Sequence, residues 1–485
     1  MKKRTLLARV SFILIFVLLL STVLWWLKYV LVLKRPDGIT TMQNLYAQKE
    51  DSCDIILLGS SHVGMNLDCA TLWEEQGYAS YALWGSMQPF WNSYYYLKEA
   101  LKTQSPQLVV LDAFTATYYI EYADTERQVT NLVGMRMGIN RLMATVVSSP
   151  PDKWINLLLE YPIFHSRIEE LTADDFNHFP WSKDLIHSKG TDTRFGSSFA
   201  ETVEMPESSE LGAIHPKQER YLRKIIELCH ENDIELLLIK TPVIDRAFYK
   251  PYMNSVQLIA DEYELPFVDI NALDAETGLC SSDNWLDGWH LNTNGARKVS
   301  SWLGSYIRSN YNIPDHRGDP DYASWDVFSE NMQKEYLGKI LLLEDYITEL
   351  RRAGYPVLIV RNDNGHDAAY QNVHAEIQRL GIGQDHSQST AKKVIYIPDQ
   401  AEPACNVEYD FSQANGEENG VYFGDIDCYV EYTEGMIVTQ NDATLFADGY
   451  PGVFLLVFDP VSKECVDCVS LHRHNSYAVV HNPIA

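Results

Sequence analysis

Short, almost uninterrupted runs of apolar residues recur through the first 312 residues of the chain. They cover 54–59, 108–112, 234–240 and 266–270. Runs of this kind are typical of strands covered on both faces. Between them, apolar residues recur at helical spacing in 91–102, 215–232 and 295–311. Because strands and helices alternate, the pattern predicts a three-layer α/β/α domain around a parallel sheet, with its site at the carboxyl ends of the strands.

The stretch 134–212 breaks this alternation. It contains Pro150-Pro151, several aromatic residues and a polar segment from 188 to 209. We interpret it as a helical insertion in an α/β domain that spans 36–314, placed where it could cover the site.

The last third of the chain has a different pattern. A polar joint at 315–320 contains Gly and Pro and marks a plausible domain boundary. Beyond it the pattern predicts a helix over 335–354, a strand over 355–360 and then mostly strands, at 393–397, 428–432 and 452–459. We therefore expect residues 315–485 to form an α+β, β-rich accessory domain.

The first 35 residues carry a membrane signal. Basic residues at 2–4 and 9 precede an uncharged stretch from Val10 to Leu27, and the apolar run resumes after Lys28. About eighteen such residues are the minimum for a span, and basic flanks remain on the cytoplasmic side. We expect a single-pass anchor with a cytoplasmic N-terminus and the bulk of the chain extracytoplasmic. A cleaved signal peptide is the alternative, but no small-x-small cleavage site is evident.

Charge and cysteine content narrow the function classes. The chain has 39 Lys+Arg against 66 Asp+Glu, a net charge of −27, which disfavours nucleic acid and anionic lipid as partners. Cysteine spacing does not give a disulfide pairing, and Cys465-x-x-Cys468 has no second CxxC or HxxxH to complete a metal site. Structural cystines, buried thiols and a redox pair all stay open. We expect no metal or organic cofactor. The eight cysteines are Cys53, Cys69, Cys229, Cys280, Cys405, Cys428, Cys465 and Cys468.

Two short motifs carry candidate chemistry. Gly59-Ser60-Ser61-His62 ends the first predicted strand, where a serine hydroxyl would lie near the positive end of the next helix. Asp287-Gly-Trp-His290 precedes the last predicted helix, and a carboxylate three residues before a histidine can orient its ring as a general base. Each motif alone has an ordinary alternative, a helix-capping serine and a surface Asp–His pair.

Together, Gly59-x-Ser61-His62 and Asp287-x-x-His290-Leu-Asn-x-x-Gly295-Ala resemble the SGNH (GDSL-like) hydrolase superfamily over residues 50–312. The resemblance implies Ser61 as nucleophile, His290 as general base and Asp287 as its orienter. It favours Ser61 over Ser60, because the family's nucleophile is the third residue of its Gly-x-Ser block.

The same resemblance implies an oxyanion hole made by the backbone N–H groups of Ser61 and Gly85. The family's third block would supply an asparagine, but 111–115 reads Leu-Asp-Ala-Phe-Thr. Without that asparagine, the protein either hydrolyses esters slowly, uses another oxyanion donor such as Gln88, or has lost hydrolytic activity. His62 either contacts substrate or simply begins the helix.

The anchor makes the chain similar to bacterial envelope proteins of this superfamily, the DltD-like and alginate O-acetylation proteins. The resemblance implies acyl-ester transfer or hydrolysis on a cell-surface polysaccharide or teichoic-type polymer, with a membrane-embedded acyl-transfer partner. A non-catalytic envelope assembly or binding protein and a lipase or thioesterase are the alternatives. The C-terminal part faintly resembles an interleukin-like EMT-inducer domain, which suggests carbohydrate or protein binding.

Overall fold

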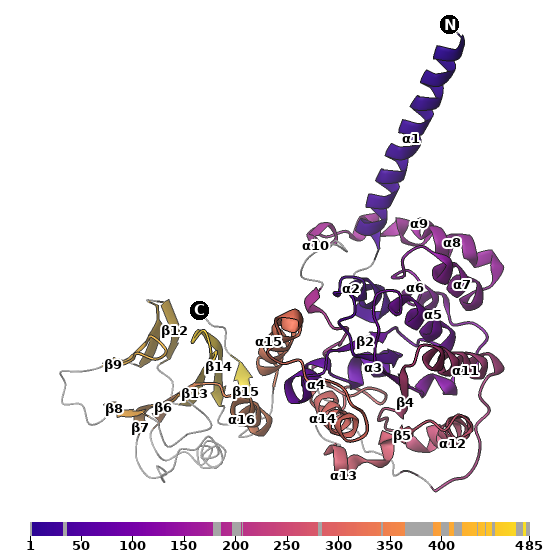
Figure 1. Ribbon diagram of the computed structural model, residues 1–485. Helices are drawn as coiled ribbons and strands as arrows, with labels where there is room; N and C mark the ends of the chain where they lie inside the picture. Colours follow the sequence, from indigo (N-terminus) through magenta and orange to yellow (C-terminus); the bar gives the residue numbers. More distant parts are fainter. Residues whose placement is uncertain are drawn as a thin grey trace. The chain divides into compact units, whose positions relative to one another are not determined.

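The computed structural model describes residues 2–32, 36–177, 186–195, 205, 207–279, 284–340, 343–363, 391–398, 407–411, 420–433, 435–441, 443–448, 452–471 and 479–481. The chain divides into two compact units, Met1–Glu330 and Asn331–Ala485 (Figure 1).

A five-stranded, all-parallel sheet in the order β2-β1-β3-β4-β5 forms the centre of the first unit. Every residue of the first three strands along the chain is buried, which is typical of parallel strands covered on both faces. The predicted parallel sheet is confirmed. Its strands are β1 (Ile55–Gly59), β2 (Ser80–Trp84), β3 (Leu108–Asp112), β4 (Glu235–Lys240) and β5 (Phe267–Asp269).

Helices cover both faces of this sheet. Because crossovers between parallel strands are right-handed, the helices after β2, β3 and β4 lie on one face, and those after β1 and β5 lie on the other. The first group is α5 (Phe90–Ala100), α11 (Pro216–Glu231) and α12 (Arg246–Glu262). The second is α3 (Ser61–Asn66), α4 (Cys69–Gln76) and α14 (Thr293–Asn310). The carboxyl end of β1 therefore opens at the point where strand order reverses.

The segment between β3 and β4 contains short helices and an extended strap. The helices are α7 (Ile139–Ser148), α8 (Trp154–Leu159), α9 (Tyr161–Phe164), the 3-10 helix η4 (His165–Glu170) and α10 (Ala173–Asn177). Residues 186–195, which we call the strap, follow the edge strand β2, where Ala82 donates its N–H to the Lys189 carbonyl at 2.8 Å.

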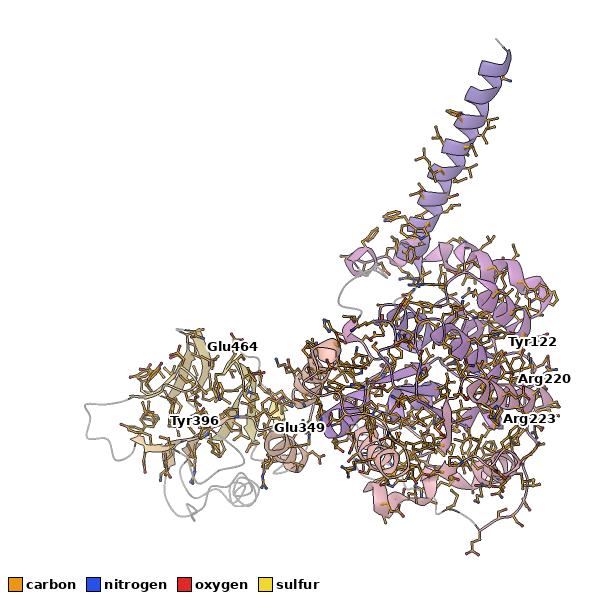
Figure 2. All side chains as sticks on the ribbon, in the orientation of Figure 1. Tyr122, Arg220, Arg223, Glu349, Tyr396 and Glu464 are labelled. Atoms are coloured by element: carbon orange, nitrogen blue, oxygen red, sulfur yellow. The ribbon has the colours of Figure 1, made fainter. Side chains whose placement is uncertain are left out.

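The N-terminal segment is one long helix, α1 (Lys2–Leu31). Residues Arg9–Leu31 are long and apolar enough to cross a membrane, and a signal sequence would have the same length and composition. Side chains project from its outer part clear of the rest of the unit (Figure 2).

The second unit is β-rich, as predicted. A six-stranded antiparallel sheet has the order β15-β14-β13-β6-β7-β8, and a four-stranded one has the order β12-β11-β10-β9. Residues of both sheets share one apolar core, for example Leu456 with Phe423 and Val438. The strands of the larger sheet are β6 (Val357–Asp363), β7 (Ala391–Ile397), β8 (Val407–Asp410), β13 (Gly452–Phe458), β14 (Cys465–Leu471) and β15 (Val479–His481). Those of the smaller are β9 (Gly420–Phe423), β10 (Cys428–Tyr432), β11 (Met436–Gln440) and β12 (Ala443–Asp448).

The helix expected over 335–354 is instead divided between two helices. The first, α15 (Ala323–Leu337), ends just before Gly338, and α16 (Leu343–Arg352) begins after it. Glycine weakens a helix because it has more backbone freedom to lose than other residues, and the continuous helical pattern of the sequence concealed that break.

Candidate active site

The two serines of the first motif have different structural roles. Ser60 is fully buried and caps α3, accepting the His62 N–H at 3.5 Å. Ser61 is the first residue of α3 and is only partly buried. Its Oγ lies 2.9 Å from Nε2 of His290, 229 positions later in the chain. The fold thus brings the two predicted motifs into hydrogen-bond contact at the end of β1.

The second motif forms a tight loop around the Asp287 carboxylate. This group accepts the backbone N–H groups of Trp289 and His290 at 2.7 and 2.8 Å. Its two oxygens also lie 3.1 and 3.2 Å from Nδ1 of His290. Partial burial acts to raise the pKa of Asp287, but the hydrogen bonds from Trp289 and His290 outweigh it, so its pKa lies below the ordinary value. Asp287 is therefore anionic and orients the ring that faces Ser61.

Asn66, at the end of α3, fixes this loop. Its Oδ1 accepts the Leu291 N–H at 2.9 Å, and its Nδ2 donates to the Pro242 carbonyl at 3.2 Å. Asn66 is fully buried. One short helix therefore begins with Ser61 and ends on the residue that holds the chain next to His290.

His62 lies behind His290. Only 1% of its surface is exposed, its ring stacks on Phe114 with centroids 3.7 Å apart, and it lies 5.1 Å from the His290 ring. Burial, then the positive charge of Lys240, holds the pKa of His62 well below its ordinary value. His62 is thus a neutral, packed wall of the site. The contact with substrate predicted from the sequence stays a prediction.

The region predicted for the oxyanion hole lies on the neighbouring strand. Gly59 pairs in register with Trp84, so Ser61 and Gly85 follow adjacent strand ends. Gln88 is fully buried, and its amide nitrogen and oxygen have no hydrogen-bond partner among the described residues. A Cβ built on Gly85 would stand 3.4 Å from Gln88 Oε1. The Gln88 atom next to Gly85 is thus the amide oxygen, and Gln88 would act as an additional oxyanion donor with its unpaired amide nitrogen turned towards the hole.

Two polar side chains near the predicted oxyanion hole already have hydrogen-bond partners in the protein. Asp112, in the block where the family has asparagine, accepts the backbone N–H groups of Phe114 and Thr241 at 2.9 and 2.8 Å. Asn131 Nδ2 donates to the Ser86 and Arg127 carbonyls, each at 2.8 Å. Asn131 therefore holds the turn after Gly85 and has no N–H left for a ligand.

The strap adds residues that the sequence did not point to. Asp192 donates its N–H to the Gly64 carbonyl at 2.8 Å, and its carboxylate pairs with Arg194 at 2.8 Å. The Arg194 N–H donates to the Thr293 hydroxyl, and the Arg194 carbonyl accepts from the hydroxyl and the backbone N–H of Thr293, at the start of α14. The strap thus runs from α3 to the helix that follows the His290 loop. Its sequence lacks any periodic signal, so only the folded chain reveals the role.

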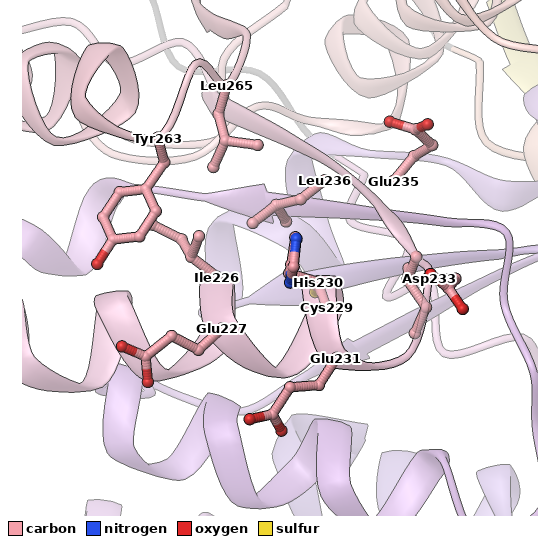
Figure 3. Close-up of a pocket in the computed structure, with 11 residues that line it drawn as sticks. Ile226, Glu227, Cys229, His230, Glu231, Asp233, Glu235, Leu236, Tyr263 and Leu265 are labelled. Atoms are coloured by element: carbon pink, nitrogen blue, oxygen red, sulfur yellow. The ribbon is translucent and has the colours of Figure 1, made fainter.

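Among the described residues, no three His, Cys, Asp or Glu side chains gather in a way that could hold a metal ion. The described cysteines are not disulfide-bonded, whereas Cys280 and Cys405 lie outside the described residues. An acidic surface pocket lined by Asp233, Glu235 and Tyr263 lies at the amino end of β4 (Figure 3). The pocket is therefore at the amino ends of the strands, whereas Ser61 follows the carboxyl end of β1.

No family model matches the sequence, and no curated protein matches it. Solved structures do. A protein described as an acylhydrolase from Bacteroides fragilis is 15% identical, with 55% of this chain and 93% of that chain covered and a TM-score of 0.27. A GDSL-like lipase from Bacteroides thetaiotaomicron is 11% identical, with 53% and 87% covered and a TM-score of 0.25. The similarity thus extends over about half of this chain.

Proposed function

We propose that this protein is a serine esterase or O-acyltransferase in which Ser61 is the nucleophile, His290 the general base and Asp287 its orienter. The observation that carries the proposal is the continuous contact from Ser61 Oγ to His290 Nε2 and from His290 Nδ1 to Asp287. Neutral serine is a weak nucleophile, and an adjacent oriented base is what activates it.

The chemistry follows from these contacts. Asp287 accepts a hydrogen bond from the Nδ1–H group of His290, which leaves the lone pair on Nε2 to remove the Ser61 proton as Oγ attacks an ester carbonyl. The negative oxygen is stabilised by the N–H groups of Ser61 and Gly85, with the Gln88 amide as the additional donor. His290 then protonates the departing alcohol, and an acyl group is left on Ser61. Water or a sugar hydroxyl, deprotonated by His290, releases it.

The substrate we propose is an acylated cell-surface polysaccharide or teichoic-type polymer. The length and apolar composition of α1 support an anchor that holds the first unit outside the membrane. Trp289, between Asp287 and His290 in the loop, is half-exposed and meets Tyr249 edge-on at 6.3 Å. An exposed indole at the site supports a sugar-bearing ligand, because rings offer a flat face for stacking. The acyl donor would come from a membrane-embedded partner, and the second unit would bind carbohydrate or protein.

The test is covalent labelling of the detergent-solubilised full chain with a fluorophosphonate, together with 4-nitrophenyl acetate turnover. Ser60→Ala is the matched control, because Ser60 is adjacent but caps the helix. We expect Ser61→Ala to abolish labelling and the acyl burst, and Ser60→Ala to retain both. Equal labelling of Ser61→Ala and the parent protein would refute the assignment.

One observation favours a second candidate, a non-catalytic envelope-binding protein on the same scaffold. Asp112 occupies the third block in place of a donor, and both of its carboxylate oxygens accept backbone N–H groups. Folded full-length protein that binds an acylated polymer but neither labels nor turns over ester would support this candidate.

A further inference from the structure

Helix α7 has its apolar side outside and its polar side inside. Four apolar residues at helical spacing are exposed by 40–67%: Ile139, Leu142, Met143 and Val146. The opposite side of the same helix is buried and mostly polar: Asn140, Arg141, Thr145 and Ser148. A surface helix of a water-soluble domain has the reverse arrangement.

Specific partners of the buried side fix this orientation. Asn140 donates to Glu99 at 2.7 Å, and Ser148 donates to Asn92 at 3.2 Å. Arg141 donates to the Leu157 carbonyl at 2.7 Å and pairs with the buried Glu160 at 3.2 Å. Rotating α7 to bury its apolar stripe would break all of these contacts and would also remove Ala144 from the core. The outward apolar stripe is therefore encoded in the packing.

The exposed apolar surface continues over the next helices. Ile155 and Leu159 of α8 are each 59% exposed, Ile168 of η4 is 58% exposed and Phe176 of α10 is 42% exposed. Large exposed apolar side chains gathered on consecutive elements mark an interaction surface. We call these four residues and the four of α7 the apolar face.

The apolar face is continuous with the foot of α1. Helix α1 contacts α9, η4 and α10, and these elements lie where α1 leaves the rest of the unit (Figure 1). The Trp26 ring lies 6.2 Å from the Phe176 ring, and the Arg167 guanidinium donates to the Leu31 carbonyl. A membrane entered by α1 would therefore begin next to the apolar face.

We infer that the apolar face rests in the interfacial layer of the same bilayer that α1 enters, so that α7 and α8 act as membrane-docking helices. The inference depends on the anchoring role proposed for α1, and not on the Ser61 chemistry. Helices that lie on membranes bury an apolar side about 5–10 Å deep at the headgroup boundary. Because the chain carries a net charge of −27, apolar contact rather than attraction to anionic lipid would drive this docking.

The test places an environment-sensitive fluorophore on the full chain reconstituted in phosphatidylcholine vesicles. Single sites are introduced by Met143→Cys and Ile155→Cys on the apolar face. Leu258→Cys on α12 is the matched control, because Leu258 is 54% exposed and α12 lies at the far end of the unit from α1. Unsubstituted protein labelled in parallel gives the background from native cysteines.

We expect the labels at 143 and 155 to emit at shorter wavelength than the label at 258, to be quenched by spin-labelled lipid, and to be protected from aqueous iodide. Quenching should be unchanged when phosphatidylglycerol is added, because charge does not drive the contact. Iodide access equal to that of the control would overturn the inference, as would crosslinking between copies through residue 143 without lipid quenching. Fluorophosphonate labelling of the same samples reports on Ser61 separately, so failure of docking and failure of the proposed chemistry are distinguishable.

Discussion

Asn66 accepts the backbone N–H of Leu291 through its side-chain oxygen at 2.9 Å, across 225 positions of sequence. Ser61 and Asn66 are the two ends of one short helix, and Leu291 follows His290 directly. The proposed nucleophile, Ser61, and the chain that carries its proposed base, His290, are thus both held by the same short helix. This makes Asn66 a positioning residue, because it controls the Ser61–His290 distance without reaching either reacting atom.

Asn66→Leu should therefore lower turnover more than stability alone explains. Removing the acceptor leaves the Leu291 N–H buried and unpaired, at a cost of about 1–3 kcal/mol, and frees the loop to move. A displacement of about 1 Å in such a site costs on the order of 10²-fold in rate. The measurement is the pre-steady-state acylation rate with 4-nitrophenyl acetate, at a temperature below that at which either variant unfolds. Thr241→Val removes the 3.4 Å contact between the Asn66 amide and the Thr241 hydroxyl but leaves the Asn66 contacts with Pro242 and Leu291 in place. It is the control and should change acylation little. Equal losses in both variants would contradict the positioning role.

Substitution of Asp287 should show whether its carboxylate assists His290 in catalysis or only shapes the loop. Asp287→Asn cannot stabilise the imidazolium formed during attack, and it favours the wrong tautomer of His290, so we expect a loss of about 10⁴-fold in kcat. That loss should be smaller than those of Ser61→Ala and His290→Ala. Turnover of all three variants with one ester substrate, beside circular dichroism to verify folding, checks the order. An Asp287→Asn enzyme as fast as the parent would mean that Asp287 only shapes the loop.

Gln88 offers a direct test of the oxyanion donor set. If its amide stabilises the developing oxyanion, Gln88→Leu should lower kcat on the order of 10²–10³-fold with little change in KM, as for loss of one such donor. Because Gln88 is buried with its amide unpaired among the described residues, the apolar replacement should not destabilise the fold. Thermal unfolding beside steady-state kinetics gives both readouts. An unchanged kcat in stable Gln88→Leu protein would exclude the Gln88 amide as a third oxyanion donor.

Local sequence predicted the parallel sheet and both chemical motifs because each depends on residues close together in the chain. Apolar runs failed to indicate β2, which includes Ser80 and Tyr81. Two of its side chains bond to residues distant in the sequence: Tyr81 donates to the Thr41 carbonyl and Trp84 to the Gly190 carbonyl, both at 2.6 Å. Asn131 was missed for the same reason, since its contact with Ser86 spans 45 positions of sequence. Such long-range hydrogen bonds decide what a buried polar residue does, and no local pattern encodes them.

Substitutions at Gly85 and Asn131 should have non-additive effects on stability and on kcat. A Cβ on Gly85 would stand 2.2 Å from Asn131 Oδ1, which is closer than real Cβ contacts come. Gly85→Ala should therefore push the turn that carries the candidate oxyanion N–H, costing about 1–3 kcal/mol of stability and lowering kcat. Adding Asn131→Ala removes the obstructing atom, so the double variant should recover part of both losses. A coupling of about 0.5–3 kcal/mol between the two sites is expected from a double-mutant cycle on unfolding. Strictly additive losses would exclude the steric explanation.

Lys189, in the strap, should give the protein a distinctive pH dependence of stability. It is fully buried, with its ammonium 3.4 Å from the centre of the Trp325 ring and bonded to Gln48, Ser324 and the Ile186 carbonyl. Burial lowers the pKa of Lys189 to about 7, whereas an unfolded lysine titrates near 10.4. Between these values the unfolded chain binds a proton that the folded chain lacks, so the contribution of Lys189 to stability rises with pH by about 1.4 kcal/mol per unit.

Lys189→Met removes this titration and retains an unbranched apolar chain over Trp325. The difference in unfolding temperature, parent minus variant, should therefore be lowest at about pH 6 and increase towards about pH 9. Thermal unfolding of the full chain in detergent, followed by intrinsic fluorescence, measures it. Lys49→Met is the matched control, because Lys49 is an exposed lysine paired with Asp321 at the surface. Parallel pH curves for the parent and Lys189→Met would show that Lys189 stays protonated across this range, held by its hydrogen-bond partners and the Trp325 ring.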